Sequence, residues 1–264
     1  MEKLGLIAGN GKFPILFAMG AKSKGVKVKA VAIKGETDSS LTNFVDEIVW
    51  IEPGELGKLF ITLKGFNVEN AVMAGAVHKE LLYKSALDKE VQNLLKEVKD
   101  QRDASLLGAV ASRLKSIGIT LVDSSTFLSD LLPEPGILTK VEPTQSQWQD
   151  IEFGKDIARQ LAGLDIGQTI VVKDKAILAI EAIEGTDETI RRAGRFAEDG
   201  VVVKMARPKQ DMRFDIPVIG PKTIDVMLES HASCLAIEAK KTLLLEKEKL
   251  LSLANTHSIP VAII

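Results

Sequence analysis

The sequence predicts an α/β protein with a parallel sheet in its amino-terminal half and a mixed α/β arrangement in its carboxyl-terminal half. Apolar runs of strand length alternate with segments of helical spacing, which is typical of parallel strands connected by helices. A proline-rich segment, 131–144, interrupts this alternation near the middle of the chain. In the second half, two apolar runs are separated only by Asp174-Lys175, and this spacing predicts an antiparallel hairpin.

The amino-terminal half opens with an apolar run and then a helical segment that has Pro14 in its first turn and Gly25 as its stop. Further segments follow at the spacing of strand–helix–strand units, which predicts a parallel sheet with helices on both faces. The predicted strands are Leu4–Gly9, Val26–Ile33, Glu47–Ile51, Glu69–Gly75 and Gly118–Asp123. The predicted helices are 13–25, 55–65 and Asp103–Leu114.

The segment 131–144, "LLPEPGILTKVEPT", holds three prolines and no helical periodicity, so we place a domain boundary there. The predicted domains are 1–132 and 133–264. After the boundary, the predicted helices are 149–164, Asp187–Glu198, 220–232 and 246–257. The predicted strands are the two arms of the hairpin within 168–183, then Gly200–Ala206, 233–239 and 260–264.

The composition is that of an ordinary globular chain and excludes several classes of function. The 264 residues carry a formal net charge of −2, which argues against binding of nucleic acid through a broad basic face. Cys234 is the single cysteine, so an internal disulfide and a cysteine-based zinc site are excluded. Its apolar neighbours predict a packed thiol rather than a nucleophile. The three histidines are not paired at metal-ligand spacing.

The chain shows no targeting or membrane-spanning signal. The apolar start of the sequence is too short and wrongly flanked for a signal peptide. No run of about 18 apolar residues is present, so no transmembrane helix is expected. We therefore expect a cytoplasmic protein.

The first candidate for chemistry is the glycine turn "AGNGKFP". Gly9, Asn10 and Gly11 lie between a predicted strand and a predicted helix, where backbone amides and the helix dipole favour a phosphate. Gly75 ends another strand at the same edge of the predicted sheet. The turn departs from a dinucleotide-binding fingerprint, because Pro14 stands at its last glycine position. A purely structural turn remains the alternative.

The second candidate is the charged stretch that follows the strand "VVVKMA". Asp211 and Asp215 supply the carboxylates that Mg²⁺ prefers, and Lys204, Lys209 and Arg213 supply cations for phosphate. Flanking prolines stiffen the connector and lower the entropic cost of ordering a site. The pattern leans toward phosphoryl chemistry, and a surface cluster of salt bridges is the alternative. Alternation along the short segment predicts buried side chains on either side of Asp215.

The third candidate is the segment "EGTDETIRR" at the start of a predicted helix. Thr186 and Asp187 stand at the helix start, and Arg191 follows one turn later. One of the two arginines of this segment is expected to reach the helix start. The alternative is that Thr186 or Asp187 only caps the helix.

Several segments, spread in a fixed order over essentially the whole chain, together carry a family resemblance. They are "LGLIAGNGKFP", "GELGKLF", "AGAV", "DASLL", "LDIGQTIVV", "EAIEGTDETIRRAG", "VVVKMARPKQDMRFDIPVIGP" and "LAIEA". The chain thereby resembles the LpxI-type UDP-2,3-diacylglucosamine pyrophosphatases of lipid A synthesis. The long segment with "RFDIP" and the "EGTD" segment are specific, whereas the glycine turn alone is not.

The resemblance implies an amino-terminal Rossmann-like domain and a carboxyl-terminal catalytic α/β domain that hold the lipid product between them. It implies a Mg²⁺-dependent hydrolase, with Mn²⁺ as a substitute. Water would attack the α-phosphorus of UDP-2,3-diacylglucosamine and give UMP and 2,3-diacylglucosamine 1-phosphate, known as lipid X. The implied partner is a lipid-linked sugar nucleotide and not a nucleic acid. Peripheral contact with the inner membrane and a homodimer stay open.

The resemblance also assigns residues. Asp215 falls on the aspartate of the "RFD-P" motif, the key catalytic residue of the family. The expected catalytic residues are Asp215, Asp187 and Asp211. The expected metal ligands are Asp215, Asp187 and Asp103. The expected substrate- and phosphate-binding residues are Gly9, Asn10, Gly11, Gly75, Thr186, Arg191, Lys204, Lys209 and Arg213.

Two other functions compete with this reading. An NAD-type oxidoreductase would suit the amino-terminal fold, but Lys34-Gly35 stands where an acidic residue should end the second strand. A sugar-nucleotide or lipid carrier without catalysis would tolerate the loss of Asp215, whereas an enzyme would not.

Overall fold

The computed structural model describes residues 2–77, 87–98, 103–214 and 216–264. It divides into two compact units. The first unit comprises Met1–Ser129 together with Asp211–Asp215, and the second comprises Asp130–Gln210 and Ile216–Ile264. Both units are α/β, which confirms the predicted fold class. The predicted division into 1–132 and 133–264 stays a prediction.

The first unit is built on a five-stranded parallel sheet in the order β3-β2-β1-β4-β5. Its strands are β1 (Lys3–Ala8), β2 (Lys27–Ile33), β3 (Glu47–Ile51), β4 (Asn70–Ala74) and β5 (Thr120–Leu121). The chain runs outward from β1 to β3 and then crosses back to β4 on the other side of β1. The strand order therefore reverses between β1 and β4, which is where open α/β sheets bind ligands.

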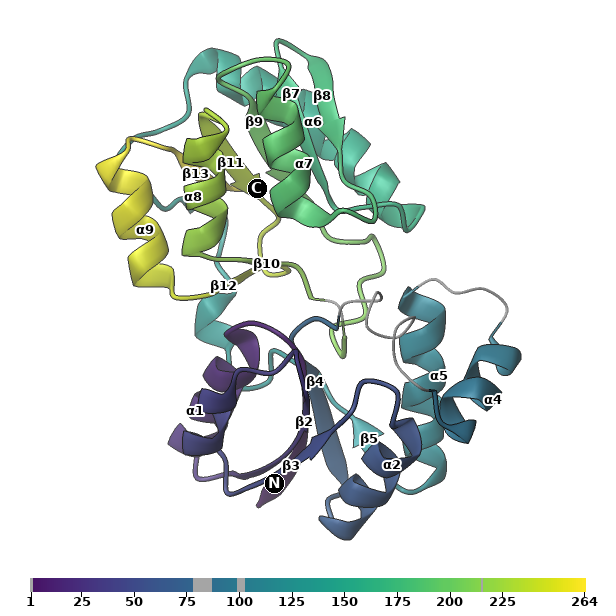
Figure 1. Cartoon of the computed structure of the whole chain (residues 1–264). Helices are drawn as coiled ribbons and strands as arrows, with labels where there is room; N and C mark the ends of the chain where they lie inside the picture. The colour runs from purple at the N-terminus through teal and green to yellow at the C-terminus, as the bar shows by residue number, and fades with distance from the viewer. Residues whose placement is uncertain (1, 78–86, 99–102, 215) are drawn as a thin grey trace. The chain divides into compact units, whose positions relative to one another are not determined.

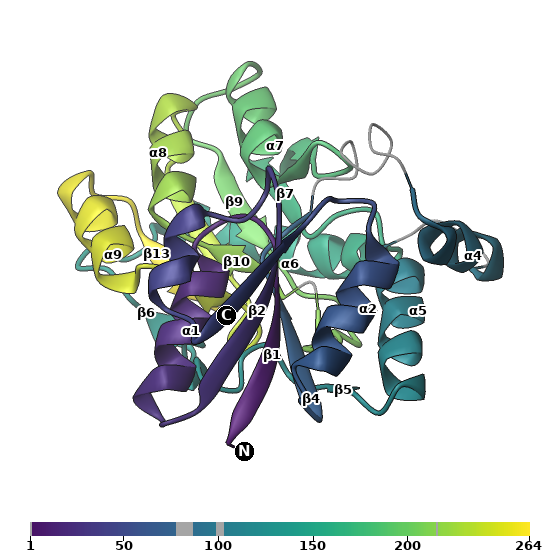
Figure 2. The same cartoon turned by 60° about the horizontal axis from the view of Figure 1, so that its bottom comes forward.

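Helices cover both faces of this sheet, as Figures 1 and 2 show. On one face lies α1 (Phe13–Ser23), together with the 3₁₀ helix η1 (Ser39–Asn43). On the other face lie α2 (Leu56–Gly65) and α5 (Asp103–Ser116), and α4 (Lys89–Glu97) packs on these two helices. Phe214 is buried in the core under α2 and α5, so a residue from the distant carboxyl-terminal half completes this unit.

The second unit is built on a six-stranded mixed sheet in the order β6-β13-β11-β9-β7-β8. Its strands are β6 (Gly136–Ile137), β7 (Thr169–Lys173), β8 (Ala176–Ile180), β9 (Val201–Lys204), β11 (Cys234–Ile237) and β13 (Val261–Ile263). The three strands β9, β11 and β13 are parallel, and β6, β7 and β8 each run antiparallel to their neighbours. A separate parallel pair joins β10 (Val218–Ile219) to β12 (Leu243–Leu244).

Two apolar cores lie on opposite faces of the six-stranded sheet. The helix α6 (Gln145–Gly163) packs on one face, and α7 (Gly185–Gly194), α8 (Pro221–Glu229) and α9 (Lys247–Thr256) cover the other, as Figure 1 shows. Alternation along β9 sends Val201 and Val203 toward α6 and Val202 toward α7. Lys204 follows the same alternation and faces the α7 side, so the sheet places a lysine beneath a helix.

Several predicted boundaries need correction. The helix predicted at 149–164 begins at Gln145, because Thr144 and Gln147 form a capping box. The helix predicted at Asp187–Glu198 is α7, Gly185–Gly194. The proline-rich segment 131–144 was expected to be irregular, yet it contains β6, which pairs with β13. The hairpin at Asp174-Lys175 is confirmed, with φ of 50° and 58° at these two residues.

Within the described ranges, no helix has both the length and the apolar character needed to cross a membrane.

Candidate functional site

In the first unit, the two glycine loops meet at the point where the strand order reverses. The amide of Gly9 donates to the carbonyl of Ala74 at 2.8 Å, and the amide of Asn10 donates to the carbonyl of Ala76 at 2.6 Å. A Cβ added to Gly9 would lie 2.4 Å from the Ala76 oxygen. A Cβ added to Gly75, whose φ is +87°, would lie 2.4 Å from the Asn10 oxygen. Gly9 and Gly75 are therefore needed because a side chain at either position would collide with the backbone of the other loop.

A third loop is tied to the same place. The Thr37 hydroxyl donates to the carbonyl of Ala8 at 2.6 Å and accepts from the amide of Ile33 at 2.9 Å. The Asn10 side chain donates to the carbonyl of Glu36 at 3.2 Å. Thr37 is not among the candidates from the sequence. The one sequence signal for Thr37 is its position just after a predicted strand, because ligands bind at the carboxyl ends of the strands in such sheets.

The helix α1 begins directly at this edge. Gly11 has a φ of +89° with open space around its Cα, and the helix follows two residues later. The residue before the helix, Lys12, makes no side-chain capping bond to it and instead pairs with Asp38 at 2.8 Å. Gly9, Asn10, Gly11 and Gly75 thus lie together beside a helix start, where Asn10 and Gly11 are exposed, Gly75 is half-buried and Gly9 is buried.

The charged stretch after β9 separates into parts that belong to different units. Residues 211–214 belong to the first unit, where Ser124 holds them through its amide to the Met212 carbonyl (2.8 Å) and its hydroxyl to the Arg213 carbonyl (2.7 Å). Lys204 and Lys209 belong to the second unit. Lys209 is exposed.

Asp211 and Arg213 form a two-pronged ion pair. The Arg213 Nε and Nη2 atoms lie 2.9 Å and 2.6 Å from the two Asp211 oxygens. This side-chain hydrogen bonding lowers the pKa of Asp211 and raises that of Arg213. The pair is partly open to solvent, and its hydrogen bonds favour the ionised form of Asp211.

Asp215 lies outside the described residues, and so does the side chain of Asp103. The neighbours of Asp215 are described: Phe214 and Ile216 are each 7% exposed, and Arg213 is exposed. The predicted burial on both sides of Asp215 is therefore confirmed for these neighbours.

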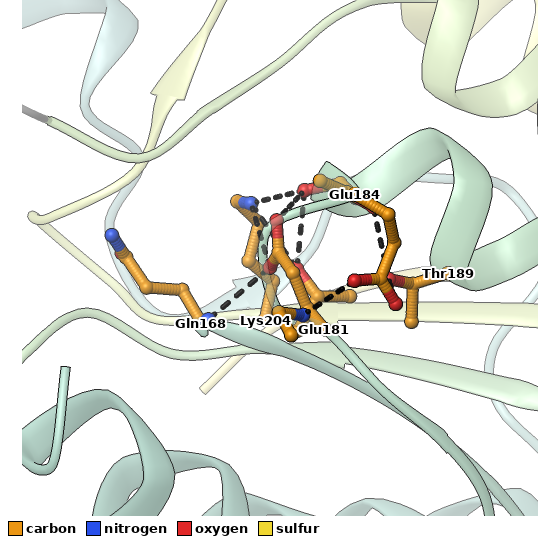
Figure 3. A network of polar contacts seen from close by, with 9 residues as sticks. Gln168, Glu181, Glu184, Thr189 and Lys204 are labelled. Atoms are coloured by element: carbon orange, nitrogen blue, oxygen red, sulfur yellow. Dashed lines mark hydrogen bonds and ion pairs between the residues drawn. The ribbon is translucent and has the colours of Figure 1, made fainter. Parts of the chain in front are cut away.

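In the second unit, Lys204 lies at the centre of a buried polar network (Figure 3). Its ammonium donates to the hydroxyls of Thr186 (2.8 Å) and Thr169 (3.2 Å) and forms an ion pair with Glu181 at 4.0 Å. Thr186 donates in turn to Glu181 at 2.9 Å. The side chains of Lys204 and Glu181 are only 8% and 12% exposed. The network fastens the start of α7 to the ends of β7 and β9.

Glu181 is held ionised in spite of its burial. Burial alone would raise its pKa, but the charge of Lys204 and hydrogen bonds from Thr169, Thr186 and the Gln168 amide outweigh it and lower the pKa. Glu181 is the first residue of the family segment "EAIEGTDETIRRAG", but it was not among the candidate site residues that the sequence predicted. The pairing of residues 181 and 204 depends on strand register, which the sequence alone does not specify.

Neither Thr186 nor Asp187 caps α7. Glu184 occupies the capping position, and Gly185 follows it with a φ of +81°, so the alternative that Thr186 or Asp187 only caps the helix is wrong. The Glu184 carboxylate accepts from Arg192 at 2.6 Å. Arg192 also donates to the Ile180 carbonyl at 2.7 Å. It is thus Arg192, and not the candidate Arg191, that reaches the helix start.

The other candidates on α7 are engaged on its outer side. Asp187 pairs with the exposed Lys222 at 2.7 Å. Arg191 pairs with Glu188 at 2.5 Å and with Glu229 of α8 at 3.1 Å. Of the nine expected binding residues, the four at the glycine loops lie together in the first unit, and Thr186 and Lys204 lie together in the second.

Within the described part of the chain, no group of three or more His, Cys, Asp and Glu side chains is placed to hold a metal ion. Of the expected ligands, the carboxylate of Asp187 is the one that is described, and it contacts Lys222. Its donor type suits Mg²⁺, which prefers carboxylate oxygens and keeps several waters. The expected metal ligands stay a prediction.

Comparison with known proteins covers nearly the whole chain. The LpxI N-terminal domain family matches residues 3–131, and the LpxI C-terminal domain family matches residues 134–262. A curated relative, the UDP-2,3-diacylglucosamine pyrophosphatase LpxI of Caulobacter vibrioides, is 30% identical over 267 aligned positions. That alignment spans 97% of this chain and 95% of the relative.

Solved structures give a much weaker likeness. A biotin carboxylase domain of a thermophilic 2-oxoglutarate carboxylase matches with 12% identity and a TM-score of 0.30, over 74% of this chain and 32% of that one. The biotin carboxylase subunit of a pyruvate carboxylase matches with 13% identity and the same TM-score, over 74% of this chain and 41% of that one. At this level of similarity neither comparison bears on function.

Proposed function

The chain belongs to the LpxI family, and from this premise we propose that it hydrolyses UDP-2,3-diacylglucosamine to UMP and 2,3-diacylglucosamine 1-phosphate. The observation that carries the proposal is the near end-to-end match to a relative named for this pyrophosphatase activity. The substrate would therefore be a lipid-linked sugar nucleotide, and the pathway would be lipid A synthesis.

The reaction consists of one displacement at phosphorus. The oxygen of a water molecule forms a bond to the α-phosphorus, and the bond from this phosphorus to the oxygen that bridges the two phosphates breaks. The leaving group is the sugar 1-phosphate, and the water oxygen remains on UMP. The water loses its proton to the solvent, and we assign to Asp215 the orientation of this water for attack.

The described residues support the binding part of this proposal. The glycine loop exposes Asn10 and Gly11 directly before the start of α1, a position that suits a phosphate group. In the second unit, Thr186 and Lys204 place a hydroxyl and a cation at the start of α7. Arg213 and Lys209 add exposed cations. Each of these groups stabilises negative charge, which diphosphate cleavage requires more than a strong nucleophile.

We further propose that Mg²⁺ is required and that Mn²⁺ replaces it. The carboxylates of Asp215, Asp187 and Asp103 would hold the ion, because they have the donor chemistry that it prefers. The bound ion would neutralise charge that develops on the phosphates. Asp211 would assist from its ion pair with Arg213, which keeps its carboxylate oriented.

The test is a UMP-release assay with UDP-2,3-diacylglucosamine in detergent micelles. UMP should form with Mg²⁺, stop with EDTA and return when Mg²⁺ or Mn²⁺ is added back. In water enriched in heavy oxygen, the label should enter UMP, because the α-phosphorus is attacked. Label in the sugar 1-phosphate would refute attack at the α-phosphorus. Binding of the substrate without any UMP release would support the carrier function instead.

A further inference from the structure

The buried network around Lys204 joins a group that can only donate hydrogen bonds to a group that can only accept them (Figure 3). The ammonium of Lys204 carries three hydrogens and no lone pair, whereas the ionised carboxylate of Glu181 carries lone pairs and no hydrogen. The Thr186 hydroxyl lies between them, 2.8 Å from the Lys204 nitrogen and 2.9 Å from a Glu181 oxygen. These two neighbours therefore determine how the hydroxyl is oriented.

The single hydrogen of the Thr186 hydroxyl goes to Glu181. Its oxygen accepts from Lys204, which cannot accept in return, so the hydrogen is left for the carboxylate. The Thr169 hydroxyl is a weaker alternative acceptor, because it is uncharged and lies 3.3 Å away. The hydrogen bonds thus run in one direction, from Lys204 through Thr186 to Glu181.

Thr169 is held in the same way. Its hydroxyl accepts from Lys204 at 3.2 Å and donates to Glu181. The second oxygen of Glu181 accepts from the Gln168 amide at 3.1 Å, and the amide of Glu181 donates to the Thr169 carbonyl at 2.9 Å. These bonds fix the carboxylate in place. Both threonine hydroxyls therefore present an oxygen, and not a hydrogen, to Lys204.

One ammonium hydrogen of Lys204 is left over. Within the described ranges, its acceptors are the hydroxyls of Thr186 and Thr169, and the Glu181 carboxylate at 4.0 Å is too distant for a third hydrogen bond. The Lys204 side chain is nearly but not fully enclosed, since 8% of it is exposed. A negatively charged oxygen is the acceptor that binds such a hydrogen most strongly.

We propose that Glu181 is a positioning residue of this site. By accepting from both threonine hydroxyls, it directs their oxygens to Lys204 and leaves the third ammonium hydrogen for a phosphate oxygen of the substrate. This inference rests on the proposed function, in which Lys204 binds phosphate. Glu181 itself does not touch the substrate. The Thr186 hydroxyl acts through Lys204, because its own hydrogen is taken by the carboxylate.

The test compares Glu181→Gln with Glu181→Asp. The amide in Glu181→Gln donates as well as accepts, so one threonine hydroxyl would turn its hydrogen toward Lys204 and weaken its hold on the ammonium. The KM for UMP release should rise by roughly tenfold or more, because a charge-assisted hydrogen bond to phosphate is weakened. Calorimetric titration with inorganic pyrophosphate in EDTA buffer should show a similar loss of affinity. Glu181→Asp keeps the carboxylate and should recover part of both losses, although its side chain is shorter.

The matched control is Asp150→Asn. Asp150 is a carboxylate of α6 that is only 4% exposed, and it accepts from the amides of Asp174 and Lys175 at 3.0 Å and 2.7 Å. These amides form the turn of the β7–β8 hairpin, at the opposite end of both strands from Glu181. Asp150→Asn should lower the melting temperature but leave KM and the affinity for pyrophosphate unchanged, because unfolding reduces only the number of active molecules.

A purely structural role for Glu181 would give this same pattern in Glu181→Gln, and that result would overturn the proposal. So would a KM that is higher in Glu181→Asp than in Glu181→Gln, since the effect would then follow the shape of the side chain and not its charge. A wild type that does not bind pyrophosphate would also overturn it.

The proposed positioning and the proposed hydrolysis fail separately. A folded Glu181→Gln protein that releases UMP with the KM of the wild type would refute positioning and leave hydrolysis standing. In the other case, the wild type binds pyrophosphate but releases no UMP, and the affinity falls in Glu181→Gln and recovers in Glu181→Asp. That outcome would refute hydrolysis and leave positioning standing.

Discussion

Gly9 and Gly75 lie so close together that neither has room for a side chain. A Cβ on Gly9 would lie 2.8 Å from the Gly75 carbonyl oxygen, and a Cβ on Gly75 would lie 2.8 Å from the Gly9 carbonyl carbon. The sequence suggested that glycines at this edge admit a ligand. In the structure, the missing side chains let the two loops pack against each other. Any ligand would therefore meet two loops that are already joined by hydrogen bonds.

Gly75→Ala should therefore lower the free energy of unfolding by about 2 kcal/mol or more, because the new methyl meets backbone and the φ is positive. Gly108→Ala, at an open position within α5, should instead raise it by about 0.5–1 kcal/mol. Urea unfolding of both variants would measure the difference. Equal stability of Gly75→Ala and wild type would refute the close contact.

Lys204→Met should destabilise the protein by about 3 kcal/mol, because it leaves the carboxylate of Glu181 buried without its cation. The double variant Lys204→Met with Glu181→Gln should recover most of this loss. A double-mutant cycle by urea unfolding would measure the coupling. Additive effects of the two changes would mean that the ion pair contributes nothing.

Stability should fall in acid through Glu181. Its pKa is lowered in the folded state from an ordinary value of 4.5, so the unfolded chain binds its proton first. The stabilising contribution is present above pH 4.5 and is lost as the pH falls through the folded pKa. Glu181→Gln removes this titration, and its stability should decline less steeply below that pH. Parallel curves for the variant and the wild type would contradict the assignment.

Asp215→Ala should remain folded and lose turnover on the order of 10²-fold or more, as for other strong electrostatic catalytic groups. Substrate should still bind, because the cationic residues are unchanged. Asp211→Ala should be milder. Asp156→Ala, an exposed position on α6, serves as the control and should be unaffected. UMP release at saturating substrate, alongside melting curves, would decide. A folded Asp215→Ala protein with normal turnover would revive the carrier function.

Cys234 should be unreactive in the folded protein. Its side chain is fully buried in β11, and burial raises the pKa of its thiol to about 12. Iodoacetamide should label it only when urea unfolds the second unit, which mass spectrometry would detect. Rapid labelling of native protein would contradict the buried placement and the inert role that the sequence predicts.

The sequence predicted most of the regular structure because strand and helix periods are local properties. The strands at Glu47–Ile51 and Cys234–Ile237 follow from apolar runs alone. It missed β6, β10 and β12, each only two residues long. Strands of that length have no periodicity to detect, and they exist because a partner strand supplies their hydrogen bonds.

The sequence indicated which types of residue form the candidate site, but it did not indicate which side chains contact one another there. Asp187 was expected near a metal ion, and the structure pairs it with Lys222, which lies on a different helix. Lys204 was expected to face phosphate, and it is largely enclosed by Thr169, Thr186 and Glu181. Such pairings arise from strand register and helix packing, which couple residues far apart in sequence.

The burial of Phe214 in the first unit has a consequence for the order of folding on the ribosome. The chain emerges from its amino terminus, so the first unit is almost complete by Ser129, yet one core residue arrives about 85 residues later. Until then, the nascent unit lacks Phe214 and the bonds from Ser124 to Met212 and Arg213. The first unit would thus stay unfinished until most of the second has been synthesised, and the segment that holds Phe214 would be the last part of the first unit to be fixed in place.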